Sequence, residues 1–262
     1  LGKLTKGLGI TGELNRKNIC GQELWIEDDG FTCEGSDEEV IFVPNKNSTF
    51  DVLSAQGLFY KAGIKKIVFA GEGTIDFKNK KVFLVCGVDR FGMAEELQEA
   101  GAKLTFGDLL FGLGFNKPLR SLEALASWAK VLAPIVTRLP VSWLYPMGKE
   151  QQKRTPKFLQ YFLENDIIAG DFHFIRKFMP EKLPGKTIIT NTVTAADRAM
   201  LKEAGVKLLV TTTPSLEGRS FGTNVMEALL VALKGAKASL SADEYIELLD
   251  KYKIEASIEY LK

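Results

Sequence analysis

The chain has 262 residues, of which 45% are hydrophobic and 26% charged, the composition of a globular protein and not of a disordered tail or a fibre. It carries 34 Lys and Arg against 33 Asp and Glu, a formal charge of +1. This balance provides no long-range field that attracts phosphate polymers, so we expect no nucleic-acid partner.

Cysteine usage and hydropathy favour a soluble cytoplasmic protein. The three cysteines have no C-x-x-C spacing, and an odd number cannot all pair within the chain. The longest apolar stretch, residues 119–147, is interrupted by charged residues and prolines, so we predict no membrane span and no membrane partner. The first residues show neither the charged nor the apolar segment of an export signal.

Residues 1–75 are expected to form a small β-rich lobe. Alternating polar and apolar residues predict short strands at 23–28 and 40–43, separated by turn residues. A helical pattern at 51–62 and an apolar run at 64–70, which predicts a further strand, follow them. We interpret this part as an N-terminal α/β lobe.

From residue 81 onward, short apolar runs alternate with helical patterns, which indicates βα units that build a parallel sheet. Residues 81–87 are too uniformly apolar for a half-exposed strand. A helix is predicted at 90–100, ended by Gly101, and a second strand at 102–106.

The same pattern recurs after residue 165. Strands are predicted at 166–169, 187–190 and 207–211, and a helix at 195–204, where Thr194 begins a capping box. The fold class that we predict is α/β: a Rossmann-like, doubly wound, mostly parallel sheet with a small N-terminal β-rich lobe and a helical insertion.

Two domains are therefore expected, the lobe at 1–75 and a Rossmann-like nucleoside-cofactor domain at 76–262. Residues 117–163 are predicted to be a helical insertion between the two halves of the second domain. Its tryptophans, Trp128 and Trp143, and its aliphatic residues exceed what a lone helical hairpin buries. We expect this insertion to supply a lid or the contact of a homodimer.

The turn after the strand at 81–87 lies where a Rossmann sheet presents a helix N-terminus to a phosphate or a nucleoside. It departs from G-x-G-x-x-G, because Asp89 stands where the second glycine lets the backbone approach a pyrophosphate. Asp108, just past the second strand, is placed to bind ribose hydroxyls, or else to cap a short helix at 109–113. The candidate cofactor-binding residues are Gly87, Asp89, Arg90, Phe91, Gly92, Gly107, Asp108, Thr211 and Thr212.

The only histidine, His173, lies just beyond a predicted strand end, and Asp171 precedes it by two residues. Because imidazole gains and loses a proton near neutral pH, the two residues are a candidate acid–base pair; alternatively, His173 packs on or caps a short helix. Arg176 and Lys177 are placed to bind a substrate carboxylate, or else they are solvated.

Hydroxyl and amide groups follow two further predicted strands. Asn191, Thr192 and Thr194 are candidate catalytic residues that would orient a small polar ligand, although Thr194 also fits a helix cap. Before an apolar helix, Gly222, Thr223 and Asn224 allow close approach of a substrate to the backbone. The sequence shows no metal-ligand spacing, no G-x-S-x-G elbow and no P-loop, so no metal is expected.

Several segments are similar to a known family; they are residues 88–94, 106–109, 118–122, 138–140, 143–146, 168–173, 190–194 and 218–228. Together they resemble a prokaryotic Rossmann-type family commonly labelled quinate 5-dehydrogenase, over about residues 81–250. This resemblance implies an oxidoreductase that uses NAD or NADP on a small polar cyclic metabolite.

A fainter likeness points to the S-adenosylmethionine-dependent pyridinol methyltransferase of iron-guanylylpyridinol cofactor biosynthesis. That likeness implies methyl transfer to a small hydroxylated ring, with S-adenosylmethionine as the cofactor. The carboxylate of Asp89 is tolerable beside a sulfonium nucleoside, whereas it opposes a pyrophosphate. We expect the NAD(P)-dependent oxidoreductase first, with the methyltransferase as one alternative and a non-catalytic nucleotide-binding sensor as another.

Overall fold

A computed structural model describes residues 24–27, 30–33, 75–136, 154–216, 219–220, 223–235 and 240–261. At its centre is a six-stranded sheet, in which only the last strand is antiparallel to its neighbour. This confirms the α/β class with a mostly parallel sheet. In spatial order the strands are β4 (Lys103–Phe106), β3 (Lys81–Leu84), β5 (Ile167–Ala169), β6 (Thr187–Thr190), β7 (Leu208–Thr211) and β10 (Ser257–Tyr260).

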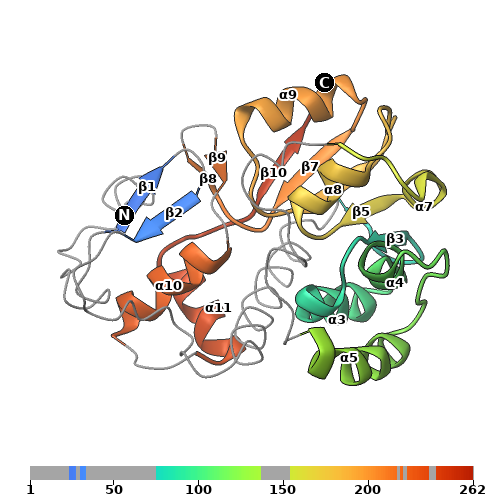
Figure 1. The fold of residues 1–262 in the computed structure, drawn as a ribbon. Helices are drawn as coiled ribbons and strands as arrows, with labels where there is room; N and C mark the ends of the chain where they lie inside the picture. The colour runs from blue at the N-terminus through green and yellow to red at the C-terminus, as the bar shows by residue number, and fades with distance from the viewer. Residues whose placement is uncertain are drawn as a thin grey trace.

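The chain winds away from β3 in two directions. Through α3 (Phe91–Glu99) it reaches β4 on one side. From β5, which lies on the other side of β3, it continues outward through α8 (Phe172–Phe178) and α9 (Ala195–Glu203). Because the winding reverses between β3 and β5, the helices of the two halves cover opposite faces, as Figure 1 shows.

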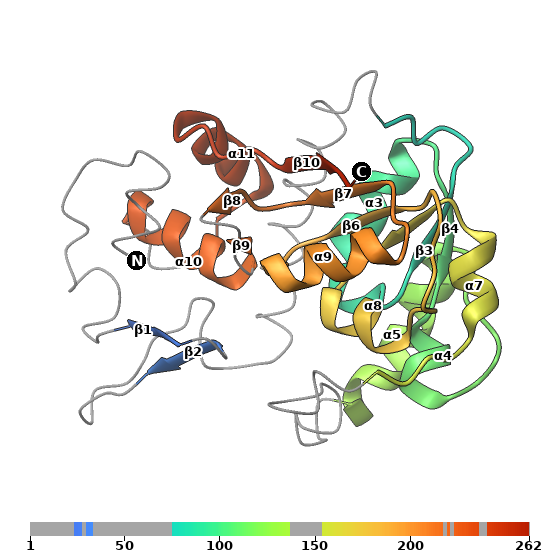
Figure 2. The ribbon, with the colours of Figure 1, turned by 90° about the horizontal axis from the view of Figure 1, so that it is seen from above.

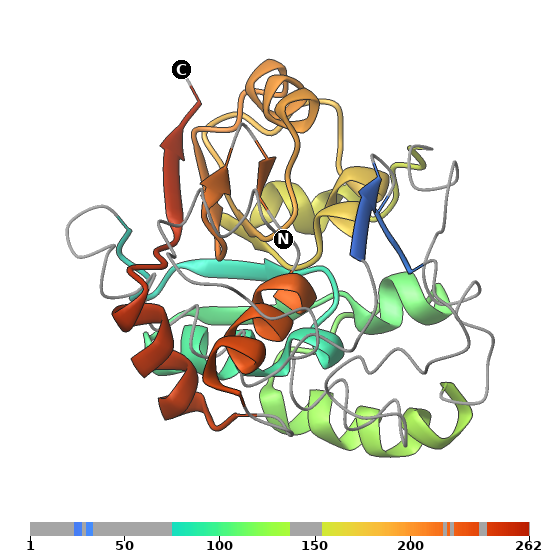
Figure 3. The same ribbon diagram turned by 90° about the vertical axis from the view of Figure 1, so that its left-hand side faces the viewer.

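Both faces of the sheet are buried, which explains why its strands are uniformly apolar. Val82 and Leu84 of β3 face the core that α3 and α5 (Leu122–Val136) cover. Phe83 and Val85 face the opposite core, under α7 (Leu159–Glu164), α8 and α9. The layers are seen edge-on in Figure 3, with α5 below the strands and α9 above them. Full burial of such a side chain contributes about 1.5–3 kcal/mol.

The helix ends agree with the residues that the sequence places there. Gly101 and Gly205 follow α3 and α9 with φ angles of +87° and +83°, in the left-handed region that a side chain disfavours. At the start of α9 the hydroxyl of Thr194 accepts a hydrogen bond from the Asp197 N–H, and the Asp197 carboxylate accepts one from the Thr194 N–H. The predicted capping box is confirmed.

The C-terminal part adds elements beyond the predicted sheet. Helix α10 (Thr223–Lys234) packs against α11 (Ala242–Lys251) around a small apolar core of its own. Figure 2 shows this pair to the left of the six-stranded sheet. After α11 the chain adds β10 to the sheet edge, antiparallel to β7, which the sequence pattern did not predict. A short hairpin, β8 (Ser215–Leu216) and β9 (Arg219–Ser220), precedes α10.

In the N-terminal part, β1 (Leu24–Glu27) lies within the strand predicted at 23–28. Its antiparallel partner is β2 (Gly30–Cys33), which was not predicted because Gly30 was interpreted as a turn residue. The elements predicted at 40–43, 51–62 and 64–70 lie outside the described residues.

Within residues 117–163 the structure describes two helices, α5 and the start of α7, joined to non-helical residues at 117–121 and 154–158, and residues 137–153 lie outside the described part. Within the described residues, no helix has the length and apolar character that crossing a bilayer requires.

Candidate functional site

Parallel sheets bind ligands at the carboxyl ends of their strands, where the winding direction reverses. In this protein that switch point lies between β3 and β5. The turn after β3 and the turn after β5 both leave the sheet there, and Arg90 of the first contacts Asp171 of the second. The turns around Gly87 and Asp171 are therefore at the same end of the sheet, as expected.

The turn after β3 is closed by the carboxylate of Asp108. This carboxylate accepts hydrogen bonds from the Gly87 N–H at 2.9 Å and the Val88 N–H at 2.9 Å, and from the Cys86 thiol at 3.6 Å. Asp108 is the first residue of α4 (Asp108–Leu113), whose N-cap is Gly107 and has no side-chain cap bond. Its carboxylate thus ties the β4 end to the β3 turn and does not cap the helix. Ribose binding by Asp108 stays a prediction.

A buried ion pair joins the two turns across the switch point. The guanidinium of Arg90, at the end of the turn η2 (Val88–Arg90), lies 2.9 Å from the carboxylate of Asp171. Their side chains are 7% and 16% exposed. The other oxygen of Asp171 accepts a hydrogen bond from the backbone N–H of His173 at 2.8 Å and so caps α8. Asp171 is thus held by Arg90 and by the backbone of His173, and the imidazole is only partly buried.

Packing within the protein explains why these turns contain glycines. A Cβ on Gly87 would lie 2.5 Å from the ring of Phe106, and a Cβ on Gly107 would lie 2.6 Å from the carbonyl oxygen of Val85. Gly170, with φ at +126°, fits directly against Val85. These glycines allow the turns to pack on one another, whatever they do for a ligand.

The hydroxyl groups at the same sheet edge are mostly occupied. Thr190 donates a hydrogen bond to the Gly170 carbonyl at 2.8 Å, and Thr211 donates one to the Thr213 carbonyl at 2.8 Å. Thr212 is the exception, because its hydroxyl is buried and forms no hydrogen bond with the described part of the chain. Asn191 is also buried, and its backbone carbonyl accepts a hydrogen bond from the Ser220 hydroxyl. A buried polar edge of this kind suits a small polar ligand.

The remaining candidates separate from one another. Arg176 forms an ion pair with Asp197 at 3.1 Å, so its charge is already balanced, while Lys177 is directed to a cavity elsewhere. Thr192 is partly buried beside Asn191, and the hydroxyl of Thr194 is engaged in the cap of α9.

Four candidates are not fully described. Gly222 lies outside the described residues, and so do the side chains of Thr223, Asn224 and Asp89. In α3, Phe91 is half-buried and Gly92 is buried.

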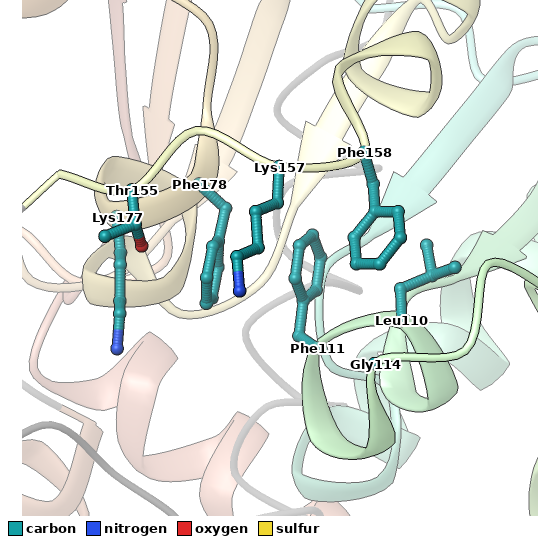
Figure 4. Close-up of a pocket in the computed structure, with 8 residues that line it drawn as sticks. All are labelled: Leu110, Phe111, Gly114, Thr155, Lys157, Phe158, Lys177 and Phe178. Carbon is teal, nitrogen blue, oxygen red and sulfur yellow. The ribbon is translucent and has the colours of Figure 1, made fainter.

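A cavity of about 640 Å³ lies away from the switch point, between the far ends of α4 and α8 (Figure 4). Of its lining residues only Lys177 was singled out from the sequence. The cavity is assembled from three chain segments, so no local pattern marks it. Its lining residues are Leu110, Phe111, Gly114, Thr155, Lys157, Phe158, Lys177 and Phe178.

Among the described residues, no group of His, Cys, Asp and Glu side chains is arranged to hold a metal ion. The positive charge at the switch point comes from Arg90, which Asp171 already balances, while Asp108 adds a negative charge that the turn N–H groups stabilise. The edge is thus polar and, in sum over these three groups, negatively charged.

A doubly wound, mostly parallel sheet with buried polar groups at its switch point defines the class of the fold, an α/β protein. Within this class the chain belongs to the family described as a domain of unknown function (DUF8754), whose model matches residues 66–261. The match covers the six-stranded sheet and the helices around it. The curated proteins compared with the chain gave no match.

Proposed function

We propose that the protein is an enzyme that transforms a small polar cyclic metabolite at the switch point, with a nucleoside cofactor that carries no phosphate. The class that fits best is an S-adenosylmethionine-dependent methyltransferase of a small hydroxylated, pyridinol-like ring. The observation that carries this proposal is the Asp108 carboxylate, which occupies the Gly87 and Val88 N–H groups of the first turn.

The reasoning is electrostatic. In a dinucleotide-binding turn the backbone N–H groups and the helix dipole face the pyrophosphate. Here a carboxylate already accepts those N–H groups. A phosphate charge brought within about 4 Å of this carboxylate meets a repulsion of about 4 kcal/mol at an effective dielectric constant of 20. A sulfonium charge at the same distance is attracted by a similar amount.

The chain's own groups supply what such a reaction needs besides the methyl donor. When bound, S-adenosylmethionine carries the methyl group on a positively charged sulfur. The acceptor ring must lose a hydroxyl proton, and His173, partly exposed at the start of α8, is a base within the same edge. Thr192 and the buried hydroxyl of Thr212 would orient the ring through hydrogen bonds.

A second candidate is the NAD(P)-dependent oxidoreductase of the quinate dehydrogenase-like class. The position of His173 supports it, because a partly exposed imidazole at the start of α8, beyond the end of β5, can exchange a proton with a substrate hydroxyl as hydride moves. The turn after β3 disfavours this class, because the Asp108 carboxylate would repel the pyrophosphate of NAD or NADP.

Thermal unfolding of the full chain with each cofactor separates the two classes. We expect S-adenosylmethionine to raise Tm and NAD and NADP to leave it unchanged, because a ligand that binds only the folded state stabilises it. Adenosine and ADP form a matched pair, and adenosine should bind more tightly. A Tm shift with NAD or NADP alone would replace the methyltransferase by the oxidoreductase, and no shift with any nucleoside would remove both.

Variants test where the ligand lies once a cofactor is known. Thr192→Val alters the carboxyl end of the sheet, and Thr187→Val, at the amino end of β6, is its matched control. Turnover should fall in the first and persist in the second. His173→Asn should lower turnover by about a hundredfold to ten-thousandfold if His173 is the general base. Binding without any turnover would favour a sensor.

A further inference from the structure

We propose that the cavity between α4 and α8 is a second binding site, and that its ligand is a small organic anion with a flat apolar body, such as an aromatic carboxylate. The site goes beyond the proposed function, because the cavity lies at the far ends of the helices whose first residues, Asp108 and Asp171, belong to the switch point.

The walls of the cavity are rigid aromatic rings. Phe111 of α4 stacks on Phe178 of α8, with ring centres 4.3 Å apart and planes at 15°. Phe158 packs edge-on against Phe111 at 5.7 Å, and Phe111 also contacts the core residue Phe83. Because these rings are anchored in the core, the apolar surface is formed before any ligand arrives, which reduces the entropy cost of binding.

The polar side of the cavity is a short segment fastened to α8. The Thr155 N–H donates a hydrogen bond to the Lys177 carbonyl at 2.7 Å, and the Lys157 N–H donates one to the Phe178 carbonyl at 3.3 Å. Arg154 reaches the Pro180 carbonyl at 3.2 Å just before this segment. The backbone that carries Lys157 is therefore fixed against the helix that carries Lys177.

Two lysine ammonium groups border this apolar surface. Within the described ranges neither Lys157 nor Lys177 forms an ion pair, and no carboxylate lines the cavity. Lys177 lies over the Phe178 ring at 5.3 Å. In Figure 4 the ends of both lysines point the same way, on either side of Phe178. The neighbouring cation Arg176, in contrast, forms an ion pair with Asp197.

These features define the ligand by its chemistry. Two cations and, among the described lining residues, no anion select a negative charge, and charge-assisted hydrogen bonds to ammonium groups are strong. Three phenylalanine rings select a flat apolar body, since aromatic pairs gain beyond their buried area. A cavity of about 640 Å³ is also within the range of small-molecule sites and far larger than a bare phosphate needs.

Calorimetric titration of the full chain with three probes tests the ligand class. We expect 2-naphthoate to bind, with a Kd that rises with salt because the charges are partly exposed. The neutral match, 2-naphthalenemethanol, should bind at least about tenfold more weakly, because it lacks the charge-assisted bonds. Equal affinity of the two probes, no binding of naphthoate, or displacement of naphthoate by equimolar phosphate would overturn the proposal.

Variants place the probe in this cavity. Lys157→Gln and Lys177→Gln should each raise the naphthoate Kd about two- to fivefold, and the double variant by about the product. Lys202→Gln, on the exposed side of α9, is the matched control and should change nothing.

Thr155→Trp keeps the backbone bond to α8 but fills the cavity with a ring, so binding should be lost. If this variant does not fold, the double lysine variant tests where the probe binds, because neither lysine forms an ion pair within the described ranges and the fold should persist. Naphthoate binding that is unchanged in the double lysine variant would show that the probe lies elsewhere and would reject the site.

Discussion

At the scale of single residues, one carboxylate organises the switch point. Asp108 accepts the N–H groups of Gly87 and Val88, and these donors lie about 20 residues away in the chain. A buried donor without an acceptor costs about 1–3 kcal/mol. The shape of the turn after β3 is thus determined by a residue of the next βα unit.

Asp108→Ala should therefore lower the free energy of unfolding by about 1–3 kcal/mol, because both N–H groups lose their acceptor. Asp108→Asn keeps one carbonyl oxygen and should lose less. Urea denaturation measures both. If the alanine variant is as stable as the parent, the carboxylate does not hold the turn, and its role at a ribose becomes the better explanation.

The glycines of α4 and its cap provide a second prediction at this scale. A Cβ on Gly107 would lie 2.6 Å from the Val85 carbonyl oxygen, whereas Gly112, in the same helix, has no heavy atom within 4 Å of such a Cβ. Gly107→Ala should be destabilising by about 1–3 kcal/mol, the range for an overpacked site. Gly112→Ala should stabilise by up to about 1 kcal/mol through helix propensity. Equal melting temperatures for the two variants would contradict this contrast.

Among the helices, residues that cap a helix are of the same types, and in the same positions after strands, as residues expected in a catalytic site. Thr194 was a candidate for both roles, and its hydroxyl both accepts from and donates to Asp197. Asp171 likewise caps α8 while it pairs with Arg90. Polar residues that follow parallel strands often begin the next helix, so position alone does not separate a cap from a catalytic group.

Thr194→Ala should cost about 1 kcal/mol of unfolding free energy through loss of the α9 cap, and Thr194→Ser should retain the stability. Thermal denaturation followed by circular dichroism measures the difference. If the serine variant is stable but inactive in the assay that identifies the reaction, the methyl group of Thr194 serves the substrate. A stable alanine variant would show that the cap is dispensable.

The pairing of α10 with α11 predicts a dependence on pH. The hydrogen bond from Lys234 lowers the pKa of Glu244 to about 2 from 4.5, with help from the Ser241 backbone N–H at the start of α11. Because the folded pKa is the lower one, this contribution to stability is present above pH 4.5 and is lost as the pH falls toward 2. Both side chains are more than one third exposed, so salt weakens the effect.

Glu244→Gln should flatten the decline of stability between about pH 4.5 and pH 2, measured by urea denaturation at a series of pH values. Asp243→Asn, at the neighbouring exposed position of α11, is the control. An unchanged pH profile in the glutamine variant would mean that the pair does not stabilise the fold.

At the scale of the whole molecule, α5 buries one side and exposes the other. Leu125 is fully buried in the core, while Trp128 and Val131 are 40% and 63% exposed. The latter two lie three residues apart, on one face of the helix. Segment 117–163 was expected to supply a lid or the contact of a homodimer, and these two exposed side chains provide a test of the homodimer.

We expect light scattering to give twice the chain mass of 29.0 kDa. Trp128→Glu combined with Val131→Glu should shift the protein to the monomer, because a charge in an apolar contact is costly to desolvate. Tyr260→Glu, at an exposed position of β10, is the control. A monomer at every concentration would exclude the dimer.

Most of the central sheet follows from the pattern of amino acids along the chain. Uniform apolar runs followed by helical patterns predicted β3, β4, β5, β6 and β7 and the doubly wound class, because a strand buried on both faces has to be apolar throughout. Gly101 and Gly205 marked helix ends for an equally local reason, the left-handed backbone that they adopt. The polar residues after these strands stay candidates for a site at the carboxyl ends of the sheet.

The contacts of those polar residues depend on how distant parts of the chain fold together. Asp108 reaches back to Gly87, Arg90 crosses to Asp171, and Arg176 turns to Asp197, over separations of 21 to 81 residues. The antiparallel strand β10 and the cavity beside Lys177 depend in the same way on where distant segments meet. Hydrogen-bond and ion-pair partners are set by distances of about 3 Å across the fold, and a pattern along the chain carries no information at that scale.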